Sequence, residues 1–245
     1  MEWTWILLHV AAALASFFQS VTGVGFGMIA GPVILMVVGD TAAVVVSTLL
    51  SWLVAVVLFP LLRRGADWQM AGRLSLGVVL GLPFGLWLLA AADITGLKLV
   101  AGCVMSLLIA MTVFGAPGMR TQHKTGDLAF GALGGVFGGA LATPGPPAVV
   151  RANAVLSGKS EVRATMVAMF VIVWPVILTG QYLSIGINAD ILRITLYLTP
   201  ATLAGIAVGN WAASRVSESL FRNVVLAILI LTAAGLLIDA LGEIA

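Results

Sequence analysis

Long stretches of hydrophobic residues alternate with short clusters of charge along the chain. Asp, Glu, Lys and Arg are absent from eight windows: 3–39, 41–62, 74–92, 99–119, 128–150, 164–189, 194–214 and 223–238. About 20 helical residues span the ~30 Å hydrocarbon core of a bilayer, so six windows each fit one crossing, the last when extended to 241. A backbone inside the bilayer must satisfy its own hydrogen bonds, and alternation along the windows is too weak for a β-barrel. The pattern predicts an all-α polytopic membrane protein.

Windows 3–39 and 128–150 are interrupted by glycine and proline, which break helices. The first contains Thr22-Gly23-Val24-Gly25-Phe26-Gly27 with Pro32 behind it, and the second contains Thr143-Pro144-Gly145-Pro146-Pro147. We expect two re-entrant hairpins, each of two short helices, with the second hairpin reaching residue 157. A cleavable signal sequence is a weaker interpretation of the first window, because it lacks a basic start and its apolar run is too long.

The two halves of the chain repeat a short pattern. Gly81, Gly85 and Trp87 recur as Gly205, Gly209 and Trp211, and the spacing of Gly23 and Pro32 recurs in Gly138 and Pro147. Paired glycines alone are common where apolar helices pack closely, but the shared tryptophan and shared order favour duplication. The expected organisation is a first repeat at 1–119, a cytosolic linker at 120–127 and a second repeat at 128–245, each with one broken segment and three transmembrane helices.

The distribution of Lys and Arg tests this topology. If all eight segments crossed the membrane, six basic residues would lie on each side, which violates the positive-inside rule. A re-entrant second segment changes the division to ten against two, with only Lys98 and Arg193 outside. The charges do not decide whether the first segment is re-entrant or a full crossing. Repeat symmetry favours a re-entrant one, which predicts inverted repeats in a bacterial inner membrane with both termini outside.

Composition narrows the function classes. Hydrophobic residues make up 61% of the 245 residues and charged residues only 9%, whereas soluble domains carry about a quarter charged residues. A soluble enzyme, a disordered chain, a coiled coil and a disulfide scaffold are therefore disfavoured, and the net charge of +2 gives no indication of nucleic-acid binding. The chain contains one cysteine and two histidines and none of the common hydrolase, nucleotide or metal motifs. We expect no catalytic residues, metal site or cofactor.

The glycine-rich breaks are suited to binding an anion. Backbone N–H groups at the start of a helix lack helical partners, and the helix dipole favours negative charge there. Prolines at 146 and 147 fit the first turn of the returning helix. The alternative is that the glycines only allow close packing. The expected substrate contacts are Gln19, Thr22, Gly23, Gly25, Gly27, Thr143, Gly145, Arg151 and Asn153. The expected break or packing positions are Pro32, Gly81, Gly85, Pro144, Pro146, Pro147, Gly205 and Gly209.

Arg151 is the most distinctive of these positions. It lies four residues after Pro147, inside the expected returning helix, and a charge at that depth is a functional hypothesis by default. Its forked guanidinium suits an oxyanion. Snorkelling of the side chain to the cytosolic surface is an equal alternative. Coupling to a proton or to sodium, the direction of transport and the oligomeric state are left open.

The glycine cluster from Thr22 to Gly27 with Pro32, the second break at 134–147 and the two halves of four apolar segments resemble the sulfite exporter TauE/SafE family. The resemblance covers nearly the whole chain and implies a transporter of sulfite, an organosulfonate or another small anion. Ala140 and Ala142 depart from it, since the family pattern has glycines there. We expect a secondary transporter that works by alternating access. A passive anion channel and a non-transporting membrane assembly protein are the alternatives.

Overall fold

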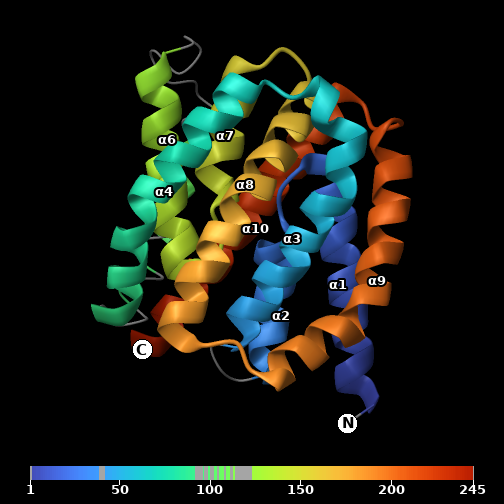
Figure 1. Ribbon diagram of the computed structural model, residues 1–245, viewed down its shortest axis with the longest axis vertical. Coiled ribbons are helices and arrows are strands. Elements are labelled where there is room, and N and C mark those ends of the chain that lie inside the picture. Colours follow the sequence, from blue (N-terminus) through green and yellow to red (C-terminus); the bar gives the residue numbers. More distant parts are fainter. Residues whose placement is uncertain are drawn as a thin grey trace.

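The computed structural model describes residues 2–38, 42–91 and 123–244, together with scattered positions between 96 and 113 (Figure 1). The described part of the chain is helical apart from short turns. Its elements are α1 (Glu2–Thr22), α2 (Phe26–Val38), α3 (Ala42–Leu62), the 3-10 turn η1 (Arg63–Gly65), α4 (Trp68–Ala91), α6 (Lys124–Leu141), α7 (Gly145–Val155), α8 (Lys159–Ile185), α9 (Ala189–Ala213) and α10 (Glu218–Ile244).

Six of the described helices, α1, α3, α4, α8, α9 and α10, are long and apolar enough to cross a membrane. This confirms an all-α, multi-pass membrane protein. The windows 41–62, 74–92, 164–189, 194–214 and 223–241 correspond to α3, α4, α8, α9 and α10. The expected helix at 99–119 lies outside the described residues, apart from the scattered positions.

Several helices begin earlier than the charge-free windows. α4 starts at Trp68, so Arg73 lies inside it, and α8 starts at Lys159. Charged side chains in the first turns reach toward the aqueous boundary while the backbone is already helical. Asp67 caps the start of α4. Its carboxylate accepts a hydrogen bond from the Met70 amide at 2.9 Å, as an N-cap residue does.

The first broken segment differs from the expected pair of short helices. α1 has 21 residues, or ~31 Å at 1.5 Å per residue, because nothing interrupts the helical pattern before Gly23. α2 has 13 residues and continues through Pro32. In the second segment, α6 has 18 residues and α7 has 11. Each segment is therefore a hairpin with one longer and one shorter arm.

The two hairpins enter the bundle from opposite ends (Figure 1). α2 returns toward the end where both chain termini lie, whereas α7 returns toward the other end, near η1 and the turn between α9 and α10. α8 runs through the middle of the bundle, and its residues Met166 to Met169 are almost completely buried. α8 thus forms the wall that both hairpin turns face.

Glycines bring two pairs of helices into backbone contact. α4 packs along α6 through Gly77, Gly81 and Gly85 on one side and Gly131, Gly135 and Gly139 on the other. A Cβ added at Gly81 or Gly85 would collide with the carbonyl oxygen of Ala132 or Val136. α9 packs on α1 in the same way, with Gly205 against Ala13 and Gly209 against Phe17. These glycines allow the close approach of small-residue helix interfaces.

Candidate functional site

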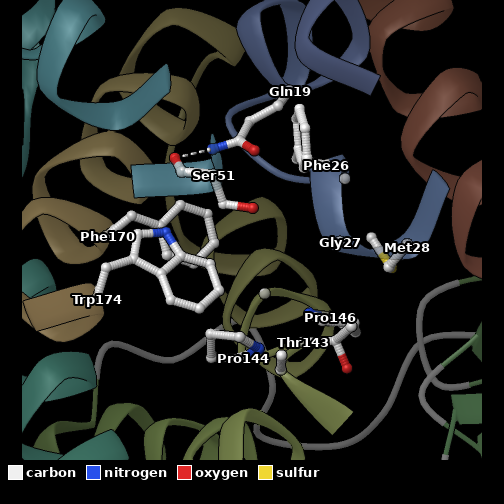
Figure 2. Close-up of a pocket in the computed structure, with 13 residues that line it drawn as sticks. Gln19, Phe26, Gly27, Met28, Ser51, Thr143, Pro144, Pro146, Phe170 and Trp174 are labelled. Atoms are coloured by element: carbon white, nitrogen blue, oxygen red, sulfur yellow. Dashed lines mark hydrogen bonds between the residues drawn. The ribbon is translucent and has the colours of Figure 1, made fainter. Parts of the chain in front are cut away.

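A cavity lies where the turns of the two hairpins meet (Figure 2). The space between its lining atoms is about 250 Å³, and part of this space is open to the outside. We call it the central cavity; its lining residues are Gln19, Gly25, Phe26, Gly27, Met28, Ser51, Ala142, Thr143, Pro144, Gly145, Pro146, Phe170 and Trp174.

The first wall of the central cavity is the turn between α1 and α2. Gly23 and Gly25 have φ angles of +85° and +123°, a region that only glycine adopts freely. The Thr22 hydroxyl stabilises the turn by accepting from the Val24 amide at 3.2 Å and bonding the Phe18 carbonyl at 2.8 Å. α2 then begins at Phe26, and the amides of its first turn have no carbonyl partner within the helix. Phe26, Gly27 and Met28 thus bring the positive end of α2 to the cavity.

The second wall is the turn between α6 and α7. Ala142 adopts a left-handed conformation with φ 52° and ψ 32°, and its amide bonds the Gly138 carbonyl at 3.1 Å. Prolines occupy the first turn of α7, at positions 146 and 147, as the sequence predicts. Because proline has no N–H, this helix start offers far fewer amide donors than α2 does. Its dipole still points its positive end into the cavity.

The two turns touch each other. A Cβ added at Gly27 would lie 3.1 Å from the Ala142 carbonyl oxygen, and one added at Gly145 would lie 3.2 Å from Val24 Cγ1 and from Phe170 Cζ. Side chains at either position would push the turns apart or fill the cavity. Glycine at these positions therefore keeps two helix N-termini within reach of one small ligand.

Three polar atoms around the central cavity are buried without a hydrogen-bond partner: Ser51 Oγ, Thr143 Oγ1 and Trp174 Nε1. Leaving a donor unpaired in the interior costs about 1–3 kcal/mol, so such atoms usually have a partner such as water or an ion. Gln19 donates from Nε2 to the Ser51 carbonyl at 3.1 Å, which orients its amide at the cavity edge (Figure 2). The described lining carries no charged side chain. This arrangement can bind a small anion through neutral donors and two helix dipoles.

The structure gathers some of the expected substrate contacts and separates others. Gln19, Gly25, Gly27, Thr143 and Gly145 line the central cavity. Thr22 and Gly23 belong to the turn behind it, where Gly23 packs against Met166 and Arg163 of α8. Asn153 lies further along α7, and its amide bonds the Val149 carbonyl of its own helix at 2.9 Å.

Arg151 lies away from the central cavity, in an ion-pair cluster. Its Nε donates to Asp127 Oδ1 at 2.8 Å, and the other carboxylate oxygen of Asp127 accepts from Arg73 Nε at 2.7 Å. Both Arg151 and Asp127 are 2% exposed, and Arg151 also donates to the His123 carbonyl at 3.2 Å. Its guanidinium is thus neither an exposed snorkelling group nor a cavity ligand. It joins α7 to α6 and, through Asp127, to α4.

Sequence reasoning missed the cavity residues of α3 and α8: Ser51, Phe170 and Trp174. Ser51 is on α3, and the rings of Phe170 and Trp174 stack with centroids 5.4 Å apart on α8. Both helices continue through an internal proline, at 60 and at 175, so no break in the helical pattern marks these positions. The polar atoms of Ser51 and Trp174, at a depth where a partner is required, were a signal for two of the three residues.

The comparisons with known proteins agree with this geometry. No curated protein and no solved structure matches the chain significantly. The sequence model of one family, described as sulfite exporter TauE/SafE, matches residues 8–236. The match spans both hairpins, the central cavity and the glycine-lined helix pairs, and the chain therefore belongs to the sulfite exporter TauE/SafE family.

Proposed function

We propose that the protein is a secondary transporter of a small sulfur oxyanion of the sulfite class, which binds in the central cavity and crosses by alternating access. The observation that carries the proposal is that one small cavity is lined by two helix N-termini and by three residues with an unpartnered polar atom, Ser51 Oγ, Thr143 Oγ1 and Trp174 Nε1. Membership in the sulfite exporter TauE/SafE family supports the substrate class.

The proposed membrane topology has two inverted repeats. The α1–α2 hairpin would enter and leave from the outer side, and the α6–α7 hairpin from the cytosolic side. Two features support this arrangement. The hairpins open toward opposite ends of the bundle (Figure 1), and α4 of the first half packs on α6 of the second just as α9 packs on α1. Both termini would then be outside, and the basic residues of η1 and the starts of α6 and α8 would face the cytosol.

The chemistry of the central cavity favours a small anion that must also be released. Neutral donors bind less tightly than a buried arginine would, so the anion does not have to break a full ion pair to leave. A space of about 250 Å³ suits a compact oxyanion better than an aryl sulfonate.

Removing the unpartnered hydroxyls tests the proposal. We expect Ser51→Ala combined with Thr143→Val to weaken sulfite binding by roughly 100-fold or more, because each hydrogen bond to a charged group contributes about 1.5–3 kcal/mol. The shape of Thr143 is kept by valine, and neither hydroxyl loses a protein partner, so folding should be unaffected. Binding is measured by calorimetry on the full chain in nanodiscs, and flux is measured in proteoliposomes.

Thr179→Val is the matched control, because Thr179 is an exposed residue of α8 whose hydroxyl bonds the Pro175 carbonyl at 2.8 Å. It should leave affinity and flux within twofold of the parent. Saturable flux in the parent that falls with the cavity variant supports a carrier. Unsaturable conductance would favour the channel alternative, and an absence of flux for sulfite, thiosulfate and sulfonates would refute transport.

A further inference from the structure

A second, larger cavity lies beside the C-terminal end of α1. The space between its lining atoms is about 950 Å³, part of it open to the outside. The start of α8 and the end of α9 form most of its wall. We call it the cationic cavity, because Lys159, Arg163 and Arg215 line it, together with the polar residues Ser160, Asn210 and Ser214.

The three basic side chains bond neutral partners. Lys159 Nζ donates to the carbonyls of Ala213 and Val216 at the end of α9. Arg215 Nη1 donates to the Trp211 carbonyl at 2.9 Å and lies over the Trp211 ring. These bonds stabilise the negative end of a helix dipole, yet they leave one N–H donor of Lys159 and several of Arg215 unused.

Arg163 is the most buried of the three, at 9% exposure. Its Nε donates to the Ser20 carbonyl near the end of α1, and its Nη2 donates to Asn210 Oδ1 at 2.7 Å. The same residue packs on the hairpin turn, because a Cβ added at Gly23 would lie 3.1 Å from the Arg163 carbonyl oxygen. Arg163 therefore links the cationic cavity to the turn that forms one wall of the central cavity.

No carboxylate forms an ion pair with these three side chains within the described part of the chain. The nearby Glu161 and Glu218 accept from the backbone amides of Ser157 at 3.3 Å and Lys159 at 2.9 Å, at the start of α8, and neither lines the cationic cavity. Three like charges around one cavity repel each other unless an anion or solvent screens them. The positive potential would raise the local concentration of anions.

The α1–α2 turn separates the two cavities. Val21, just before the turn, lines the cationic cavity, whereas Gly25, within it, lines the central cavity. Gly23 and Gly25 are the positions at which this turn adopts glycine-only angles. The two cavities therefore share this turn as a common wall.

We propose that the cationic cavity is a second anion-binding site, a vestibule that holds a hydrated oxyanion on its way to or from the central cavity. The identity of the anion rests on the proposed function. The phosphate of an anionic lipid would meet the same donors, so the test separates a soluble anion from a lipid. The larger volume fits an anion that keeps part of its hydration shell.

The test uses the full chain in nanodiscs of neutral lipid, with sulfite as the probe. Lys159→Gln combined with Arg215→Gln removes two cavity charges on side chains that are not fully buried. We expect loss of one of two sulfite sites by calorimetry, and a ~10-fold lower flux at subsaturating sulfite in low salt that shrinks as salt screens the field. Arg64→Gln, an exposed charge on η1, is the matched control and should change neither.

Each other outcome has a definite meaning. A single site that survives the double variant and is lost in Ser51→Ala/Thr143→Val overturns the vestibule and leaves the proposed function standing. A site lost only in Lys159→Gln/Arg215→Gln, with no flux for any anion, supports the second site and overturns transport. An equal fall in flux for Arg64→Gln would mean that general surface charge is responsible, which refutes the vestibule.

The lipid arm repeats the binding measurement with phosphatidylglycerol in the nanodisc. A vestibule for soluble anions predicts that the double variant loses sulfite binding in neutral and anionic lipid alike. If the cationic cavity binds sulfite in neither lipid but retains phosphatidylglycerol through purification, and Lys159→Gln/Arg215→Gln abolishes that retention, the vestibule is refuted in favour of a lipid site.

Discussion

The buried ion pair between Arg151 and Asp127 provides a way to separate folding from substrate binding. Both side chains are 2% exposed, and Asp127 also bonds Arg73 at 2.7 Å. The perturbations are Asp127→Asn, Arg151→Met and the two combined. If the cluster is purely structural, each change should lower the free energy of unfolding and leave sulfite affinity within about threefold, a difference of under 1 kcal/mol.

The structure predicts an asymmetry between the single variants. Removing one partner of a buried ion pair costs about 3–5 kcal/mol, and Asp127→Asn leaves two arginines without their shared carboxylate. Arg151→Met should cost less, about 1–3 kcal/mol, because Asp127 keeps its bond to Arg73. The double variant should cost less than the sum of the two, since the charge then left without its carboxylate is that of Arg73, whose side chain is 24% exposed.

Unfolding is followed in mixed micelles by tryptophan fluorescence, and sulfite affinity is measured on the same preparations. Arg151→Lys serves as a conservative control that keeps the charge but loses the fork. A loss of affinity beyond tenfold in Arg151→Met with unchanged unfolding would refute the reasoning, because Arg151 would then contact the anion. Equal costs for Asp127→Asn and Arg151→Met would contradict the shared role of Arg73.

Two further predictions concern the backbone. Gly81→Ala should destabilise the α4–α6 contact by about 1–3 kcal/mol, the usual cost of overpacking, because its Cβ would collide with the Ala132 carbonyl. Gly72→Ala on the same helix meets nothing within 4 Å and should stabilise by about 0.5–1 kcal/mol through helix propensity; equal effects in unfolding titrations would contradict the packing argument. Ala142→Gly should relieve part of a strain of about 1–2 kcal/mol, since Ala142 has φ 52°, and a lower midpoint of unfolding would argue against that strain.

The helices and their interruptions could be predicted from the sequence because both depend on local chemistry. Apolar windows of membrane length correspond to α3, α4, α8, α9 and α10. The glycines at 23 and 25 and the prolines at 146 and 147 fall at the hairpin turns. The freedom to adopt a positive φ angle and the lack of an N–H group depend on the residue type alone, so the sequence reveals them directly. The helix starts were predicted less accurately, because charged first turns such as that of α8 remain helical at the membrane boundary.

The partners of side chains could not be predicted in the same way. Arg151 resembles an anion ligand along the chain, and only the fold of the α6–α7 hairpin brings Asp127 to its guanidinium. Ser51 and Trp174 line the central cavity from α3 and α8, whose apolar sequences do not indicate which residues face it. Ala142 departs from the glycine expected by family resemblance yet adopts the left-handed angle that glycine would adopt there.

The exchange of partners between the halves has a consequence for biosynthesis. α1 leaves the ribosome long before α9, but the glycines that fit its small-residue face are Gly205 and Gly209 of α9. Until those residues are made, Ala13 and Ser16 must face lipid, the insertion machinery or a temporary neighbour. The native bundle can therefore close only late in translation. Premature termination before α9 would leave α1 without its partner helix, exposed to the cell's quality control.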